Sequence, residues 1–250
     1  MPLRTDRVVV RYEITFEAPF HCGTGLPRRL VDRSVQRDAT GYLFVPGSTI
    51  KGLVREACEQ IVRLFGVESA SPHDEQAAIR EFEGTHWLSC LFGSRLHPGT
   101  LCFDDALLVA EDRAFFGGAG GGTYLSQQVS ERTQVSLSRL TRTAKPGLLF
   151  SSEFGVPGLR FAGEIAGTIT DFAMEDAPDT TYALVLLVAG LLSVDHVGGS
   201  RSRGAGRCQI RTTAIQVNGR DVEAKDCLQW LEQLEYLTYA CEGGGVWCTS

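Results

Sequence analysis

The segment TTYALVLLVAGLLSV, residues 180–194, restricts the fold of this chain more than any other stretch. It has the length of a helix and is apolar on almost every face, so other elements must surround it. Its uncharged run ALVLLVAGLL is too short to cross a membrane. We therefore expect a largely buried helix in a chain of 250 residues, which is long enough to enclose a sizeable core.

The other periodic segments have a definite order along the chain. Residues 8–20 alternate as a strand, and a short strand at 42–45 ends at Pro46. Ser48 then stands at the N-cap of a helix to residue 64, whose apolar side chains form one face. We expect further strands at 101–109, 148–154, 159–172 and 208–217, a turn at 155–158, and helices at 75–82 and 222–240.

The core elements follow the order strand, helix, strand, strand, helix, strand. This order predicts an α+β fold of the ferredoxin-like (RRM-like) type, an antiparallel sheet backed by helices. We expect a single domain over residues 1–250 with two insertions, a helical one at 66–99 and a polar, glycine-rich one at 111–147. An insertion as long and polar as the second is usually functional or disordered.

Charge is distributed unevenly along the chain. The net charge is −6, which argues against a uniformly basic nucleic-acid binder. Residues 200–212 nevertheless hold four arginines and no acid. A second basic stretch, residues 25–55, sets six cations against two aspartates: Arg28, Arg29, Arg33, Arg37, Lys51 and Arg55. This pattern suits a subunit that contacts RNA along one face.

The eight cysteines occur singly, and no C-x-x-C is present. The chain begins without a signal peptide and has no run of 18 apolar residues, so we expect a cytoplasmic protein with reduced thiols and no membrane partner. His86 and Cys90 have i, i+4 spacing and could bind structural zinc together with Cys58 or Cys102. Nothing in the spacing requires a zinc site.

Two segments offer groups that suit a phosphate. At the expected helix start, Ser48 and Thr49 come with unpaired amides at the positive end of the dipole, and Lys51 and Arg55 lie one turn apart. A plain N-cap with a solvated lysine is the alternative. The stretch GGSRSRGAGR, residues 198–207, lacks both familiar nucleotide-loop spacings. Its glycines still allow close approach of backbone amides to phosphates.

These motifs together resemble the RAMP superfamily (repeat-associated mysterious proteins), which builds CRISPR–Cas effector complexes. VPGSTIKGLVR is similar to the signature I-P-G-S-S-L-K-G-x-x-R, and GGSRSRGAGR resembles the diagnostic glycine-rich loop. LFGS ahead of LCFDDALL, and RLTRTAKPGLLFSSEFGVPGLRFAGEI, are further similarities. The resemblance covers nearly the whole chain, with two separate motifs in the expected order.

Within the superfamily, VDRSVQRD resembles the repeated backbone subunit of type III complexes. The resemblance implies that Asp32 cleaves target RNA with a divalent ion such as Mg²⁺ or Mn²⁺, which Asp32 would bind. The proline expected after the aspartate is replaced by Ser34 and Val35. From the residues alone, the neighbouring arginines keep this carboxylate ionised, able to bind a cation, to orient a ribose 2′-hydroxyl, or to pair with an arginine. Asp38 is expected to form an Asx-type turn.

The same resemblance implies the partners. The chain would bind guide RNA along its sugar-phosphate backbone without reading the sequence. Complementary target RNA would pair with the guide, and further RAMP subunits, either copies or paralogues, would cover the rest of it. Residues 111–147 match the thumb hairpin that wedges into this duplex, and FHCGTG places His21 beside the RNA. The expected RNA-binding residues are His21, Arg28, Arg29, Arg33, Arg37, Ser48, Thr49, Lys51, Arg55, Arg132, Arg142, Gly198, Gly199, Ser200, Arg201, Arg203 and Arg207.

Three alternatives stay open at this point. The chain could be a catalytically inactive, guide-binding structural subunit of the same complex. It could be a guide-processing endoribonuclease with His21 as general base. It could also be a metal-dependent enzyme unrelated to RNA, which a salt-sensitive RNA-binding titration would separate from the others.

Overall fold

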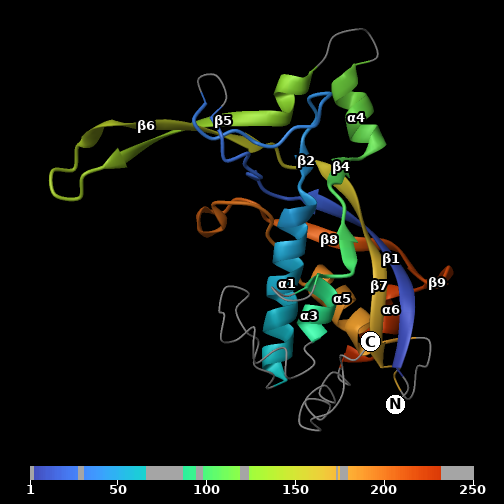
Figure 1. Cartoon of the computed structure of the whole chain (residues 1–250). Coiled ribbons are helices and arrows are strands. Elements are labelled where there is room, and N and C mark those ends of the chain that lie inside the picture. Colours follow the sequence, from blue (N-terminus) through green and yellow to red (C-terminus); the bar gives the residue numbers. More distant parts are fainter. Residues whose placement is uncertain are drawn as a thin grey trace.

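The computed structural model describes residues 3–27, 31–65, 87–93, 98–118, 124–172, 174 and 180–231 (Figure 1). The N-terminal half contains β1 (Leu3–Phe16), β2 (Phe44–Val45), α1 (Gly47–Leu64), α3 (Trp87–Phe92), β3 (Leu101–Phe103), β4 (Ala106–Leu108) and α4 (Ala110–Gly117). The remainder contains β5 (Val129–Leu137), β6 (Ala144–Gly155), β7 (Arg160–Phe172), α5 (Tyr182–Leu192), β8 (Cys208–Val217), β9 (Arg220–Val222) and α6 (Ala224–Leu228). Short 3₁₀ turns lie at Leu125–Gln128 and Arg201–Arg203.

The main sheet has the strand order β2-β4-β7-β1-β8-β9, and β3 also pairs with β7. All of these pairs are antiparallel. Because β3 and β4 pair with different parts of β7, they act as one interrupted strand. With this strand counted as one, the order of the central strands, β3/β4-β7-β1-β8, is that of a ferredoxin-like sheet. Alternation along β1 buries Val8, Val10, Tyr12 and Ile14. The expected α+β fold is confirmed.

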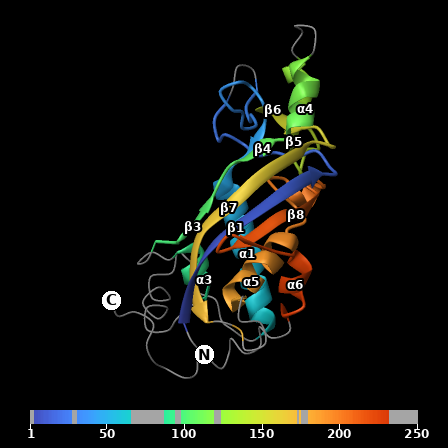
Figure 2. The same cartoon turned by 90° about the vertical axis from the view of Figure 1, so that its right-hand side faces the viewer.

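Helices α1 and α5 lie side by side against one face of the sheet (Figure 2). Ten consecutive residues of α5 are buried, from Tyr182 to Leu191, as its apolar sequence predicts. The two helices approach closely because Gly190 has no side chain: a Cβ there would lie 2.3 Å from Sγ of Cys58. The thiol of Cys58 donates to the carbonyl of Leu186 at 3.4 Å.

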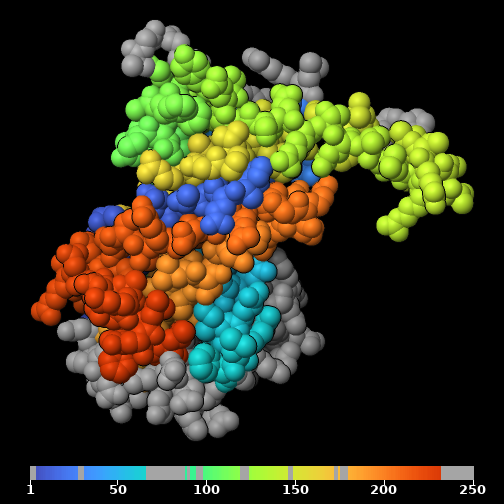
Figure 3. Space-filling model, turned by 180° about the vertical axis from the view of Figure 1, so that it is seen from behind, coloured from blue at the N-terminus to red at the C-terminus, as the bar shows by residue number. Residues whose placement is uncertain are grey.

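A two-stranded hairpin, β5 and β6, forms a sheet of its own and extends away from the body (Figures 1 and 3). The strand expected at 148–154 is part of this hairpin: it pairs with β5, whereas the following strand β7 pairs with β1. The hairpin therefore continues past residue 147, and the first residues of the expected insertion form α4. Leu137, Leu140 and Leu149 are exposed on it.

Several expected elements differ in extent or fall elsewhere. The first strand begins at Leu3 and ends at Phe16, earlier than the expected 8–20. The expected helix at 75–82 lies outside the described residues, as does most of the expected helix at 222–240, of which α6 is the described part. Of the expected helical insertion at 66–99, α3 is the described helix. No helix in the described part of the chain is long and apolar enough to span a membrane.

Candidate nucleic-acid interface

The first turn of α1 differs from the expected one. The helix begins at Gly47 with Pro46 at its N-cap, so the prediction that Ser48 caps it is wrong. The carboxylate of Asp105 takes the capping role and accepts the amide of Gly47 at 2.8 Å. A Cβ at Gly47 would lie 2.0 Å from the carbonyl oxygen of Phe103, so glycine is needed where the helix meets β3. The exposed Ser48 is left inside the first turn.

The glycine-rich loop, residues 198–207, is folded tightly against the segment that follows β1. Gly198, Ser200, Gly204 and Gly206 all have positive φ, which explains the glycine content at three of these positions. The amide of Gly199 donates to the carbonyl of His21 at 2.9 Å. The amide of Gly206 donates to the carbonyl of Pro19 at 2.8 Å. These bonds bind the loop to the body, so it is not a linker.

A cavity of about 390 Å³ lies where the start of α1, the segment after β1 and this loop meet. It brings together six residues that are far apart in the sequence and were all expected to bind RNA: His21, Ser48, Thr49, Gly198, Gly199 and Arg201. Cys22, Gly23, Gly52, Leu53 and Glu56 complete the lining. A helix N-terminus beside a glycine-rich loop is a common arrangement for binding a phosphate.

The arginines of the loop lie at the surface, and Arg201 also lines the cavity. Arg201, Arg203 and Arg207 are exposed. Arg201 pairs with Glu56 at 3.4 Å, and Arg207 with Glu17 at 3.1 Å. Exposed pairs of this kind contribute about 0–1 kcal/mol, so a phosphate can replace either carboxylate at little cost.

Asp32 lies on a strip of chain, residues 31–37, that runs along β6 of the hairpin. Its Oδ2 accepts the amide of Ser151 at 2.8 Å, while the amides of Asp32 and Arg33 both donate to the carbonyl of Ser151 at 3.2 Å. The amide of Glu153 donates to the carbonyl of Arg33 at 2.9 Å. The hairpin base therefore determines where the exposed Asp32 carboxylate points.

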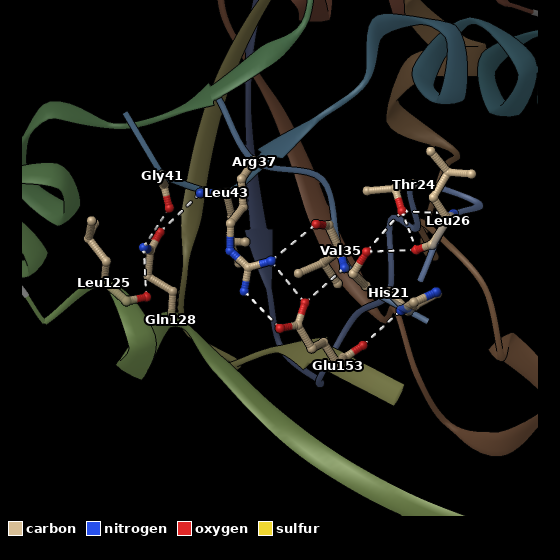
Figure 4. A network of polar contacts seen from close by, with 11 residues as sticks. His21, Thr24, Leu26, Val35, Arg37, Gly41, Leu43, Leu125, Gln128 and Glu153 are labelled. Carbon is tan, nitrogen blue, oxygen red and sulfur yellow. Dashed lines mark hydrogen bonds and ion pairs between the residues drawn. The ribbon is translucent and has the colours of Figure 1, made fainter. Parts of the chain in front are cut away.

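Glu153 is a residue that the sequence analysis did not single out. It is buried, and its carboxylate accepts two hydrogen bonds from Arg37, at 2.8 and 3.1 Å, and one from the amide of Val35 at 3.1 Å (Figure 4). Its carbonyl lies 2.7 Å from Nδ1 of His21. Gln128, also buried, binds the amide of Leu43 at 3.0 Å. A lone acid in the uncharged run LLFSSEFG was the only sequence signal for this network.

Asp38 forms the expected Asx-type turn. Its Oδ1 accepts from the amide of Thr40 at 2.8 Å and from the amide of Tyr42 at 3.0 Å, and Arg113 of α4 pairs with Oδ2 at 2.6 Å. Burial raises the pKa of this carboxyl, but the hydrogen bonds and the Arg113 charge outweigh burial and hold the pKa below its ordinary value. Asp38 stabilises the loop and is turned to its own backbone.

The other expected RNA-binding residues lie in varied surroundings. Arg55 pairs with Glu59 and donates to the carbonyl of Gly93, whereas Lys51 lies on α1 outside the cavity lining. The guanidinium of Arg132 lies 4.9 Å from the centroid of the Phe154 ring, and Arg142 is exposed at the hairpin turn. Arg33 is exposed beside Asp32, Ser200 opens the 3₁₀ turn of the loop, and Arg28 and Arg29 lie outside the described residues.

The donor groups of the described residues form no ready-made metal site. Within the described ranges no three His, Cys, Asp or Glu side chains are grouped so that they could hold an ion. Asp32 alone fits a divalent ion only if phosphate oxygens of RNA supply further ligands. Of the expected zinc ligands, His86 and the side chain of Cys90 lie outside the described residues, and Cys58 donates to Leu186.

Fold and site define a ferredoxin-like domain with a projecting hairpin, in which the glycine-rich loop and the start of α1 line one cavity. The chain belongs to the RAMP superfamily, whose family model matches residues 13–209. It is 26% identical over 182 residues to the CRISPR system Cms endoribonuclease Csm3 of Streptococcus thermophilus, covering 71% of this chain and 73% of that protein.

Solved structures agree with this assignment at the level of the fold. A chain of the type III-B Cmr-beta complex bound to cognate target RNA matches with a TM-score of 0.56 and 11% identity, covering 88% of this chain and 98% of the other. A chain of the apo complex matches with a TM-score of 0.52 and 11% identity, covering 82% and 97%.

Proposed function

We propose that this chain is a backbone subunit of a type III CRISPR RNA-guided effector complex and that its cavity binds the sugar-phosphate backbone of the guide RNA. The observation that carries the proposal is the convergence of His21, the first turn of α1 and Gly198–Gly199 on one cavity. Main-chain and hydroxyl groups of this kind bind phosphate and sugar without reading bases, as a variable guide requires. The Csm3 relative supports the same assignment.

The hairpin and the strip beside it suit contact with a guide–target duplex. Exposed leucines at 137, 140 and 149 can enter between bases, while Arg132 and Arg142 contact the nucleic-acid backbone. Other RAMP subunits, as copies or paralogues, would cover neighbouring stretches of the guide. The complex would work in the cytoplasm.

Cleavage of the target is assigned to Asp32. Its Oδ2 is held by Ser151, and Oδ1 has no hydrogen-bond partner in the described part of the chain, so Oδ1 is available to a ribose 2′-hydroxyl. A Mg²⁺ or Mn²⁺ ion would be held jointly by Asp32 and RNA phosphates, and when bound it would neutralise developing charge. Asp32 would orient the hydroxyl for in-line attack on the adjacent phosphate.

The test uses the complex assembled on a guide, with complementary target RNA and other nucleolytic subunits inactivated. Asp32→Ala should slow cutting at the regular positions by about 100-fold or more, the usual loss for a positioned acid–base group, while target affinity is kept. Asp38→Asn is the matched control, because asparagine also forms Asx turns and Asp38 faces its own loop. Cutting at an unchanged rate by the Asp32→Ala complex overturns the catalytic assignment.

A second function is favoured by one observation. Since Asp32 belongs to no group of three or more His, Cys, Asp or Glu side chains that could hold an ion in the described residues, a non-cleaving, guide-binding subunit of the same complex fits the geometry as well. This function predicts tight guide binding and intact target RNA in wild type and Asp32→Ala alike. Cutting of repeat RNA by the isolated chain would instead indicate guide processing.

A further inference from the structure

His21 is held between the hairpin base and the glycine-rich loop. Only 6% of the residue is exposed. Its carbonyl accepts the amide of Gly199, and its ring lies 5.6 Å from the ring of Phe154 between centroids. Gly23 leaves room for the ring, since a Cβ there would lie 2.6 Å from Nε2. The ring therefore has one orientation, with an edge in the cavity wall.

The two ring nitrogens of His21 have different roles. Nδ1 lies 2.7 Å from the carbonyl oxygen of Glu153 on β6 (Figure 4). A carbonyl oxygen can only accept, so Nδ1 carries the proton and donates. In the neutral ring Nε2 is then an acceptor. Nε2 has no hydrogen-bond partner among the described residues and is not one of their enclosed unpaired atoms, so it is an accessible acceptor on a residue that lines the cavity.

The rest of the cavity wall offers donors on Ser48, Thr49 and Arg201, and one carboxylate, Glu56, which pairs with Arg201. The amides of Thr49 and Ile50 already donate to the carbonyl of Pro46, so the first turn of α1 offers the cavity the hydroxyls of Ser48 and Thr49. A ligand that matches this wall needs negative oxygens for the donors and a separate hydroxyl for Nε2. A ribose phosphate has both groups, because its 2′-hydroxyl can donate while its phosphate accepts. Deoxyribose lacks the hydroxyl.

We infer that Nε2 of His21 accepts a hydrogen bond from a ribose 2′-hydroxyl of the bound guide, which makes the cavity selective for RNA over DNA. The backbone of the hairpin sets this selectivity, because the Glu153 carbonyl determines which nitrogen carries the proton. The inference rests on the proposed function, since it takes the cavity to bind guide RNA.

The test measures binding of the full-length chain to two oligonucleotides of one sequence, all-ribose and uniformly 2′-fluoro. Fluorine keeps an RNA-like sugar and removes the donor. His21→Asn is the informative variant, because its amide can still donate to Glu153 while the cavity acceptor is lost. Loss of one hydrogen bond should weaken wild-type binding roughly 3- to 10-fold on fluorination. The His21→Asn variant should bind the all-ribose oligonucleotide about as weakly as the wild type binds the 2′-fluoro oligonucleotide. Fluorination should then weaken the binding of His21→Asn little further.

Arg201→Gln serves as a control that should weaken both oligonucleotides equally and reduce the salt dependence. Equal fluorine effects in wild type and His21→Asn, or no effect in wild type, overturn the inference. So does a ¹⁵N spectrum of the free protein that shows the His21 proton on Nε2. Absence of salt-sensitive binding to the all-ribose oligonucleotide would instead count against the proposed function.

Discussion

Gly198 and Gly204 allow the role of the glycine-rich loop to be measured with two like substitutions. Both glycines have positive φ, 94° and 77°. A Cβ at Gly198 would lie 2.6 Å from the carbonyl oxygen of His21 and 3.0 Å from its carbonyl carbon. A Cβ at Gly204 meets nothing within 4 Å. Both substitutions therefore carry the conformational cost of a positive φ, and only Gly198→Ala adds a clash with the backbone.

The expected magnitudes follow from these contacts. Placing alanine in the left-handed region costs about 1–2 kcal/mol at either position. At Gly198 the loop must also move away from the His21 carbonyl, which is the acceptor for the Gly199 amide at 2.9 Å. Loss of that bond costs about 1 kcal/mol more. Because 1 kcal/mol corresponds to about 2–4 °C in a chain of this size, Gly198→Ala should melt several degrees below Gly204→Ala.

Thermal unfolding by circular dichroism and RNA binding by filter retention test this reasoning together. Gly198→Ala should also weaken RNA binding on the order of tenfold, about 1.4 kcal/mol, because the displaced loop forms the cavity wall. Gly204→Ala should bind RNA like the wild type despite its lower Tm. Equal melting temperatures and equal RNA affinities for the two variants would refute the account of this loop.

Two further predictions concern stability. Glu153→Gln leaves Arg37 without its ionic partner at a site where both side chains are about nine-tenths buried, and should lower the free energy of unfolding in urea by about 3–5 kcal/mol. The double variant Arg37→Met/Glu153→Met should recover most of this lost stability. Equal losses in the single and double variants would contradict the burial argument. The pKa of Asp38 is lower in the folded state than its ordinary value of 3.8. The ionised carboxylate therefore stabilises the fold fully above pH 3.8, and this contribution is lost as the pH falls through the folded-state pKa. Asp38→Asn should thus be less stable than wild type at neutral pH, with a difference that shrinks on acidification; a constant difference would contradict it.

The sequence predicted the parts of the fold that depend on local pattern. The buried helix α5, the alternating strand β1 and the order of core elements follow from apolar periodicity, because each of these elements buries one definite face. The family resemblance implied a hairpin at 111–147, but the residue pattern did not reveal strand β5, since none of its residues is buried. Without a buried face, strand periodicity has no signal.

The site was predictable in its position but not in its contacts. The family resemblance implied that His21, Ser48 and the glycine-rich loop all bind RNA, and residues of all three line one cavity. The partner of Arg37, in contrast, is 116 residues away along the chain, and Asp105 is 58 residues from the amide that it caps. Long-range pairs such as these arise from the tertiary fold, so no local spacing reveals them.

The central claim is that the guide backbone occupies the cavity between the start of α1 and the glycine-rich loop. The most direct measurement is a cryo-EM structure of the chain in its complex with guide RNA. We predict a guide phosphate within hydrogen-bond distance of the first turn of α1, with a ribose beside Nε2 of His21. A guide that runs instead over the sheet face opposite α1 and α5, with the cavity filled by solvent, would contradict the account.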